Sequence, residues 1–271
     1  MTPNETATMA RLARDLREET ADLQESLRNL AAEDFDLATP AHGWDIGDSL
    51  AHLALFDAVA SVAIEDPETF AGIANRAEKD LHYFDAEMRK LRLLPPQQLY
   101  GTFASNREAF INVALSHSGQ RILWFGPPMR TETMVTARQM ETFAHGVDIR
   151  DTLGEPIFFR RRHLNVVYLG YRTIAFAFLI HGLEKPPGDI EIVAVMADGE
   201  EVTFGKATLD EVGEKNRVRG PLGDLALLVV QRRNYADLDL EVTGLLAGAW
   251  VKIAQAYAGL PGEGRPSSKT M

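Results

Sequence analysis

One short stretch, RQMETFAHGVDIRD from Arg138 to Asp151, carries a glutamate and a histidine four residues apart. On a helix, side chains at this spacing leave the same face, so Glu141 and His145 can reach one ion together. Zinc and related metals bind histidine nitrogen and carboxylate oxygen, and catalytic sites usually combine three protein ligands with one open position. Because an E-x-x-x-H pair also occurs by chance, it indicates a metal site only if a third ligand comes from elsewhere in the chain.

The best candidate for a third ligand is His52, in the apolar stretch SLAHLALFD. A histidine in such surroundings is either a satisfied core residue or a metal ligand, and these residues alone favour the core. The other five histidines fit less well, because they lie in a turn, among polar neighbours or in the second half of the chain: His42, His82, His117, His163 and His181.

Asp148 follows His145 by three residues and offers a second role. A metal-bound histidine usually donates its other ring N–H to a carboxylate or carbonyl, which fixes the ring's tautomer. Asp148 has the right spacing to accept that proton. A surface salt bridge to Arg150 or Arg138 is an equally plausible role for Asp148.

The elements that must position these side chains are helices up to about residue 155. Apolar periodicity, capping residues and Pro/Gly breakers predict helical segments over 7–30, 45–64 with Asp45 as N-cap, 67–93, 96–116, and one that contains RQMETFAHGVDIRD and closes near Gly154. Long helices joined by short loops are typical of an antiparallel bundle, in which ligands project inward from facing helices. Residues 1–155 are therefore predicted to form a helix bundle.

After Pro156 the pattern changes. We expect an apolar helix over 161–181, strands over 190–196, 201–204, 216–219 and 238–242, and helices over 222–231 and 247–258. Residues 156–260 thus read as a small α+β domain, residues 261–271 as a flexible tail, and the whole chain as α+β. The apolar 161–181 helix is compatible with a homodimer, but packing against the bundle would leave a monomer.

Composition excludes several classes of function. The 271 residues carry a net charge of −11 and no basic stripe, which argues against a nucleic-acid partner. The basic run Arg160 to Arg162 is interpreted as a solvated or carboxylate-paired surface. The longest apolar run, Ile174 to Ile180, is too short for a membrane span, and the N-terminus shows no apolar leader, so we expect a cytoplasmic protein.

The chain contains no cysteine. Disulfides, thiolate metal ligands and a cysteine nucleophile are therefore excluded. If the chemistry needs a thiol, a separate small molecule must bring it.

Two signatures carry a resemblance to a known family. GWDIGDSLAHLALFD resembles the G-W-x-x-x-D-x-x-x-H-L-x-x-x-D signature of the DinB-like, mycothiol-dependent maleylpyruvate isomerase superfamily, and ETFAHGVDIRD resembles its E-x-x-x-H-x-x-D-x-R signature. Trp44 and Asp48 also fit. The resemblance implies a four-helix bundle whose divalent metal, usually zinc, is bound by His52, Glu141 and His145; nickel and cobalt accept the same ligands.

The second half is similar to the family's C-terminal domain through VRGPLGDLALLVVQRRNYADLDLEVTGLLAGAW, so the resemblance spans about residues 8 to 260, and it is strongest to an uncharacterised actinobacterial branch. Arg232 matches the first arginine of the family's R-R pair. It could clamp a carboxylate in a bidentate manner, or form a structural ion pair. Two positions depart from the family: Val230 replaces a frequent aromatic residue, and Leu245 replaces a frequent acidic residue after Gly244. The substrate pocket is therefore expected to differ from that of the isomerase.

The function that the resemblance implies uses the thiol mycothiol. The metal would favour its thiolate, which would attack an electrophilic carbon of a small-molecule substrate; an isomerase would then expel the thiol, whereas an S-transferase would keep it in the product. Two alternatives remain open at this stage. Metal-bound water could make the protein a hydrolase, or the protein could bind metal without turnover, as a sensor or partner-binding module.

Overall fold

The structure is a computed structural model that describes residues 3–257 and 259–268. The chain divides into two compact units, residues 1–157 and 158–271. The first is built from helices and the second from helices and a small sheet, so the α+β fold class predicted from the sequence is confirmed.

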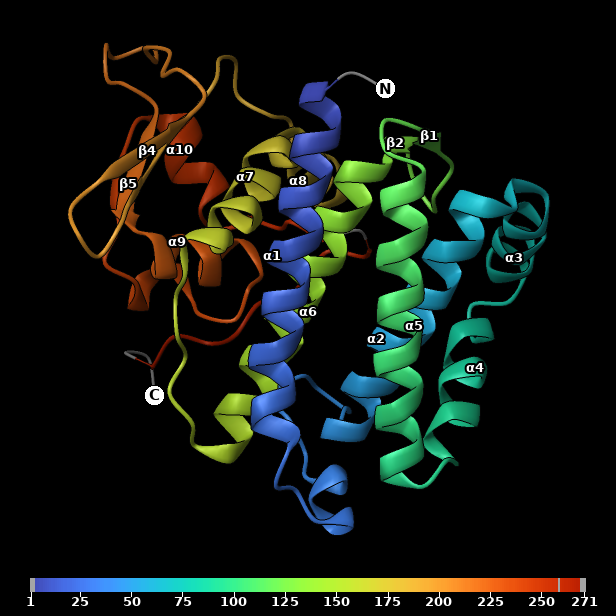
Figure 1. The fold of residues 1–271 in the computed structure, drawn as a ribbon. Helices are drawn as coiled ribbons and strands as arrows, with labels where there is room; N and C mark the ends of the chain where they lie inside the picture. The colour runs from blue at the N-terminus through green and yellow to red at the C-terminus, as the bar shows by residue number, and fades with distance from the viewer. Residues whose placement is uncertain (1–2, 258, 269–271) are drawn as a thin grey trace. The chain divides into compact units, whose positions relative to one another are not determined.

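Four long helices form the first unit: α1 (Pro3–Leu27), α2 (Ile46–Glu65), α5 (Pro96–Ser116) and α6 (Thr131–Leu153). α2 packs mainly against α5, and α1 packs mainly against α6, as the long helices of Figure 1 show. Two groups of buried apolar side chains fill the space between them, one nearer each end of the bundle. The core therefore holds α2 and α6, which carry the candidate ligands, at fixed positions.

The helix boundaries follow the expected local signals. Asp45 caps α2: its carboxylate accepts a hydrogen bond from the backbone N–H of Asp48, whose side chain accepts one from Asp45 in return. This reciprocal arrangement satisfies backbone donors that a helix start leaves unpaired. α5 begins at Pro96, as predicted, and α6 ends at Gly154, which adopts the left-handed conformation that favours glycine.

Shorter elements connect the long helices. They are a 3-10 turn η1 (Ala32–Asp36), the helices α3 (Pro67–Lys79) and α4 (Tyr83–Arg92), and a hairpin whose two strands have two residues each, β1 (Arg121–Ile122) and β2 (Met129–Arg130). The single helix predicted over 67–93 is wrong, because the chain turns after Lys79. The Asp80 carboxylate accepts the backbone N–H of His82 at 2.9 Å, and such a local bond competes with helix continuation.

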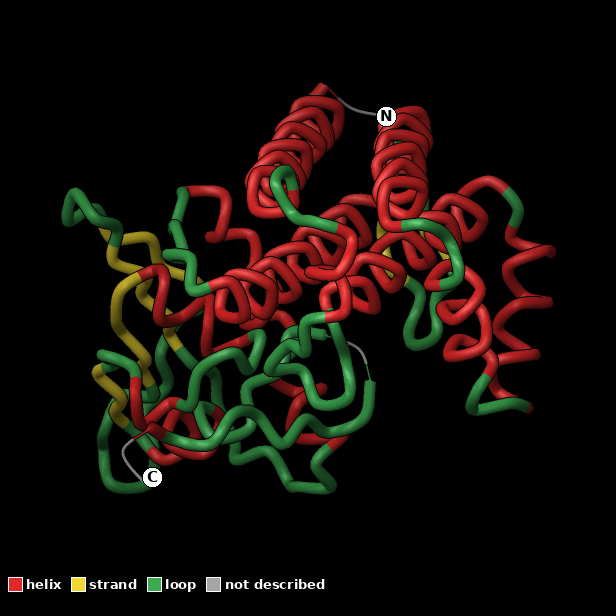
Figure 2. The backbone as a smooth tube through the Cα atoms, turned by 90° about the horizontal axis from the view of Figure 1, so that it is seen from below, coloured by secondary structure: helices red, strands yellow, loops and turns green. Residues whose placement is uncertain are grey.

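The second unit contains a four-stranded sheet in the order β4-β3-β5-β6. Its strands are β3 (Glu191–Val195), β4 (Glu201–Phe204), β5 (Arg217–Pro221) and β6 (Glu241–Thr243), of which β3 and β5 pair in parallel and the other pairs are antiparallel. The helical elements are η2 (Arg161–His163), α7 (Leu164–Arg172), α8 (Ile174–Ile180), α9 (Leu222–Val229), η3 (Tyr235–Asp237) and α10 (Leu245–Trp250). Figure 2 shows these short strands in yellow among helices and long loops.

Two predicted helices of this unit are shorter than expected. The 161–181 segment bends by 53° at Thr173. The Thr173 hydroxyl oxygen lies 3.0, 3.1 and 2.8 Å from the carbonyl oxygens of Leu169, Gly170 and Gln255, and its single proton is donated to one of these three acceptors at a time. The 247–258 helix ends at Trp250. The buried Gln255 amide then donates to the carbonyls of residues 257 and 260 and accepts the N–H of residue 262, which holds the chain in a non-helical path. Residue 258 lies outside the described residues.

The tail predicted over 261–271 is hydrogen-bonded along its first part. Asn234 donates to the carbonyl of Arg265, and the hydroxyls of Ser267 and Ser268 both donate to Asp237. These bonds tie the stretch up to Ser268 to η3, so a free tail is not what the structure shows there. The last three residues lie outside the described part.

Among the described residues, α2 alone is a single helix long and apolar enough to cross a membrane, and 61% of its most apolar window is buried inside the protein. The bent pair formed by residues 161–172 and α8 passes the same test only when counted as one span. A mostly buried apolar helix is typical of the core of a water-soluble protein.

Candidate metal centre

Three predicted ligands converge between α2 and α6. Glu141 Oε2 lies 3.6 Å from His52 Nε2 and 3.7 Å from His145 Nε2, and one ligand atom from each of the three residues lies within 4.8 Å of the other two. Donor atoms about 2.0–2.2 Å from a tetrahedral ion lie about 3.3–3.6 Å apart. The two shorter separations are therefore close to those of a ligated metal.

The cluster is enclosed but accessible. The side chains of His52 and Glu141 are 17% and 22% exposed, whereas that of His145 is 7% exposed. Parts of the Glu141 and His52 side chains thus reach solvent, whereas His145 lies in the interior.

One buried nitrogen of the cluster also supports a bound metal, because it lacks a hydrogen-bond partner. His52 Nε2 is buried and has no hydrogen-bond partner among the described residues. A buried polar nitrogen without a partner costs about 1–3 kcal/mol of folding free energy unless something binds it. A metal between His52 and Glu141 would satisfy this nitrogen.

Trp44 holds the two imidazole rings. Its indole is stacked on His145, with ring centroids 5.3 Å apart and planes 4° apart, and lies 5.3 Å from His52 in a tilted arrangement. The ring of Phe56 also lies 4.6 Å from that of His52. These two aromatic contacts restrict the rotation of His52.

Glu141 is ionised. Burial by itself would raise the pKa of this carboxyl, but the nearby His52, together with Arg138 and His145, outweighs that effect and lowers the pKa to about 2. An ionised carboxylate is the form that binds a metal.

Behind the cluster lies a buried network of opposite charges. The Asp57 carboxylate, which is fully buried, accepts hydrogen bonds from Arg107 Nε at 2.7 Å and from Arg138 Nε at 2.9 Å. Arg107 also donates to the hydroxyls of Thr20 and Thr142. The network joins α1, α2, α5 and α6 directly beneath the ligands. Sequence reasoning missed it, although Asp57 is the last residue of the first signature.

Asp148 lies next to His145, as predicted. Its Oδ2 is 3.7 Å from His145 Nδ1, and its side chain is 1% exposed. The alternative of a surface ion pair therefore does not describe Asp148, because the residue is in the interior. The distance is longer than a hydrogen bond, but the carboxylate faces the ring nitrogen opposite the one that faces Glu141.

Arg232 belongs to the second unit. It follows α9, and its Nη1 donates to the carbonyl of Val230 at 2.8 Å. Its predicted role toward a carboxylate stays a prediction.

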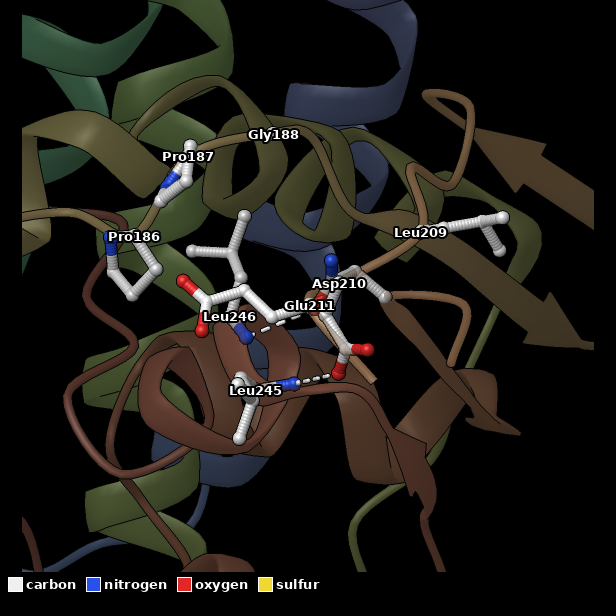
Figure 3. Close-up of a pocket in the computed structure, with 9 residues that line it drawn as sticks. Pro186, Pro187, Gly188, Leu209, Asp210, Glu211, Leu245 and Leu246 are labelled. Atoms are coloured by element: carbon white, nitrogen blue, oxygen red, sulfur yellow. Dashed lines mark hydrogen bonds between the residues drawn. The ribbon is translucent and has the colours of Figure 1, made fainter. Parts of the chain in front are cut away.

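The second unit also contains a pocket of about 320 Å³ between the 186–188 segment and the start of α10. In Figure 3 the backbone N–H of Leu245 donates to Asp210. The backbone N–H of Leu246 donates to Asn216. These bonds hold the beginning of α10. The pocket lining carries no histidine, so it does not resemble the cluster of the first unit.

A family profile and two curated relatives match the chain. The family profile described as "Mycothiol maleylpyruvate isomerase N-terminal domain" matches residues 16–150. Two uncharacterised proteins, from two strains of Mycobacterium tuberculosis, are each 34% identical over 253 residues, which cover 93% of this chain and 96% of theirs.

Two solved structures share the fold. One is a crystal structure of mycothiol-dependent maleylpyruvate isomerase (TM-score 0.57, 16% identity, 83% of this chain and 89% of that chain), and the other is a histidine-to-alanine mutant of an enzyme of that name (TM-score 0.59, 14% identity, 86% and 92%). At this identity the likeness establishes the architecture alone. Together with the profile match and the two signatures, it shows that the chain belongs to the DinB-like, mycothiol-dependent maleylpyruvate isomerase superfamily.

Proposed function

We propose that this protein is a divalent-metal-dependent enzyme that uses mycothiol to isomerise, or to transfer the thiol to, a small electrophilic substrate. Its metal ligands are His52, Glu141 and His145. The observation that carries the proposal is the convergence of these three donors from two helices, with the buried His52 Nε2 lacking any other partner in the described residues. Family membership supports the choice of thiol.

The residues around the site have separable roles in this proposal. His52 and His145 supply neutral nitrogen ligands, and Glu141 supplies the negative charge that offsets part of the ion's charge. Asp148 orients the His145 ring from its far side, as carboxylates commonly do for metal-bound histidines. Trp44 keeps both rings in place by stacking on His145 and by a tilted contact with His52.

When bound, a divalent ion in this site would lower the pKa of a thiol that reached its open position and so favour the nucleophilic thiolate. The chain itself contains no cysteine, so that thiol must be a separate molecule. Zinc is the proposed metal, and nickel and cobalt suit the same ligands. We further propose that Arg232 binds an anionic group of the thiol or the substrate.

The test is the absorption spectrum of the cobalt-substituted protein with and without mycothiol. We expect low-symmetry cobalt bands in the wild type and in His82→Ala, whose ring is on the surface, and none in His145→Ala. Addition of mycothiol should produce a sulfur-to-metal charge-transfer band. Thiol-dependent turnover should be lost in Glu141→Ala while the protein stays folded, as judged by circular dichroism.

Each outcome distinguishes a different function. Cobalt bands that do not respond to mycothiol would exclude thiol activation and favour metal-bound water or a metal-binding protein without turnover. Retained turnover in Glu141→Ala would remove this residue from the catalytic site. If the wild type binds no cobalt, the three side chains are not a metal centre.

A further inference from the structure

A row of aromatic rings begins at the ligand His52 and leads away from the candidate metal centre. We define the aromatic shelf as Phe56 of α2, Phe84 of α4 and Phe125 of the β1–β2 loop. The ring of Phe56 lies 4.6 Å from His52 and 4.9 Å from Phe84, and Phe84 lies 5.2 Å from Phe125. Three segments that are far apart in sequence thus place their rings side by side next to one ligand.

The shelf rests on a packed base. Phe70 is 1% exposed and stacked on Trp124, with planes 8° apart and centroids 5.5 Å apart. Trp124 in turn contacts Phe56 at 6.5 Å and Phe125 at 4.8 Å. The shelf thus packs against buried rings on one side, and Phe70 itself is an ordinary core residue.

The shelf is not wholly part of that core. Phe56 and Phe84 are only half-buried, and Phe125 is 40% exposed. Large apolar side chains that remain exposed next to one another often mark a binding surface. His52 and Glu141 are also partly exposed, and the shelf meets the candidate centre through the contact between Phe56 and His52.

Two arginines, Arg138 of α6 and Arg76 of α3, are already engaged by other groups. Arg138, one turn before Glu141, is buried and bonded to Asp57. Arg76 lies over the ring of Tyr83, 5.6 Å from its centroid, and so is already engaged by an aromatic face. Ring faces carry negative potential, which repels carboxylates but accepts apolar and aromatic groups.

We infer that the aromatic shelf binds a flat apolar group, most simply an aromatic ring, of the electrophilic substrate. This inference rests on the proposed function and specifies its substrate class. The reacting carbon would lie toward the metal ligands, while the apolar group would pack on Phe56, Phe84 and Phe125. Any anionic group of the substrate would point away from the shelf.

The test uses two zinc-chelating probes that differ only in their apolar group. Acetohydroxamate and benzohydroxamate bind zinc through the same two oxygens, but one carries a methyl group and the other a phenyl ring. Isothermal titration of the zinc-loaded protein gives both dissociation constants. We expect benzohydroxamate to bind about tenfold more tightly or better, because its ring would be buried on the shelf.

Two variants locate the effect. Phe125→Ala removes an exposed ring, so it should fold normally, and Phe84→Ala removes the central ring. In each, the affinity ratio of the two probes should fall at least threefold, with zinc content and acetohydroxamate affinity unchanged. The matched control is Leu93→Ala, an 86% exposed residue that follows α4, which should keep the wild-type ratio.

The outcomes separate this inference from the proposal on which it rests. The shelf does not bind substrate if zinc-loaded wild type binds both probes equally, or if the affinity ratio is unchanged in Phe125→Ala and Phe84→Ala. Either result leaves the proposed metal centre unaffected. If the wild type holds no zinc, the proposed function and this inference both fail.

Discussion

At the scale of single residues, the surroundings of each histidine decide which of its ring nitrogens faces which carboxylate. His52 and His145 present the same nitrogen, Nε2, to one oxygen of Glu141. The remaining nitrogen of His145 faces Asp148. A carboxylate in that position orients the ring and raises its basicity toward a metal.

Replacing Asp148 by Asn should therefore weaken metal binding without removing a ligand. We expect zinc affinity to fall by about 10–100-fold, the usual effect of such changes, while the fold is kept. Competition with a chromophoric chelator measures the affinity, and Asp85→Asn on the surface of α4 serves as control. An unchanged affinity would mean that Asp148 does not support His145.

At the scale of elements, α2 is the central helix of the bundle. Its N-terminus is fixed by the reciprocal cap of Asp45 and Asp48, and Arg92 of α4 adds an ion pair to Asp45 at 2.7 Å. Two turns along, His52 faces α6, and further on Asp57 binds arginines of α5 and α6. The cap, the candidate ligand His52 and the buried carboxylate Asp57 thus all belong to one helix.

Breaking the buried network should destabilise the bundle strongly. In Asp57→Ala, Arg107 and Arg138 would remain buried without their carboxylate, which typically costs about 3–5 kcal/mol. Chemical denaturation measures this loss. The control is Glu108→Gln, which breaks a surface pair with Arg17 and should cost less than about 1 kcal/mol. Similar losses of unfolding free energy in Asp57→Ala and Glu108→Gln would mean that the buried network contributes no more than the surface pair.

In the second unit, the Asp210 carboxylate connects its own loop to α10 by accepting a hydrogen bond from the backbone N–H of Leu245. Burial tends to raise the pKa of its carboxyl, but backbone N–H donors, among them those of Glu214 and Leu245, outweigh this effect and lower the pKa. A lowered pKa means that the carboxylate stabilises the folded state above its ordinary pKa and loses this effect as the pH falls.

Asp210→Asn should therefore destabilise the second unit at neutral pH, with a difference from the wild type that shrinks as the pH falls below about 4. Urea denaturation at several pH values, followed by circular dichroism, measures this difference. A difference that stays constant with pH would show that the charge of Asp210 does not contribute.

At the scale of the whole molecule, metal binding should couple α2 to α6 and stabilise the first unit. A ligand present at 100 times its dissociation constant stabilises the folded state by about 2.7 kcal/mol, which is roughly 5–10 °C in melting temperature for a unit of this size. Removal of zinc by a chelator should lower the melting temperature by that amount in the wild type but not in His145→Ala. Calorimetry checks this, and an equal shift in both proteins would point to zinc bound elsewhere.

Local sequence signals determined most of the elements. Asp45, Pro96 and Gly154 mark helix ends through capping, a fixed φ angle and a left-handed backbone, all of which act within a few residues. The break after Lys79 comes from a local bond at Asp80, whereas the two errors in the second unit involve bonds to more distant backbone groups. Thr173 reaches Gln255, and Gln255 binds the segment beyond it, so neither break follows from periodicity.

The candidate ligands were predicted from the sequence in two steps. The spacing of Glu141 and His145 places both on one face of a helix, and the family signatures added His52. Residue types alone could not join His52 to that pair, because they lie about ninety positions away. Only packing of α2 in the bundle brings its Nε2 to 3.6 Å from Glu141.

The tertiary structure alone decided what surrounds the ligands. Arg107, Arg138 and Asp57 meet beneath the site, and Phe56, Phe84 and Phe125 meet beside it, although no local pattern connects their segments. Helix periodicity fixes which residues share a face of one helix, whereas contacts between helices depend on how whole faces pack. The sequence by itself therefore determined the helices and the donor types, and packing decided the charge balance and the apolar surface at the site.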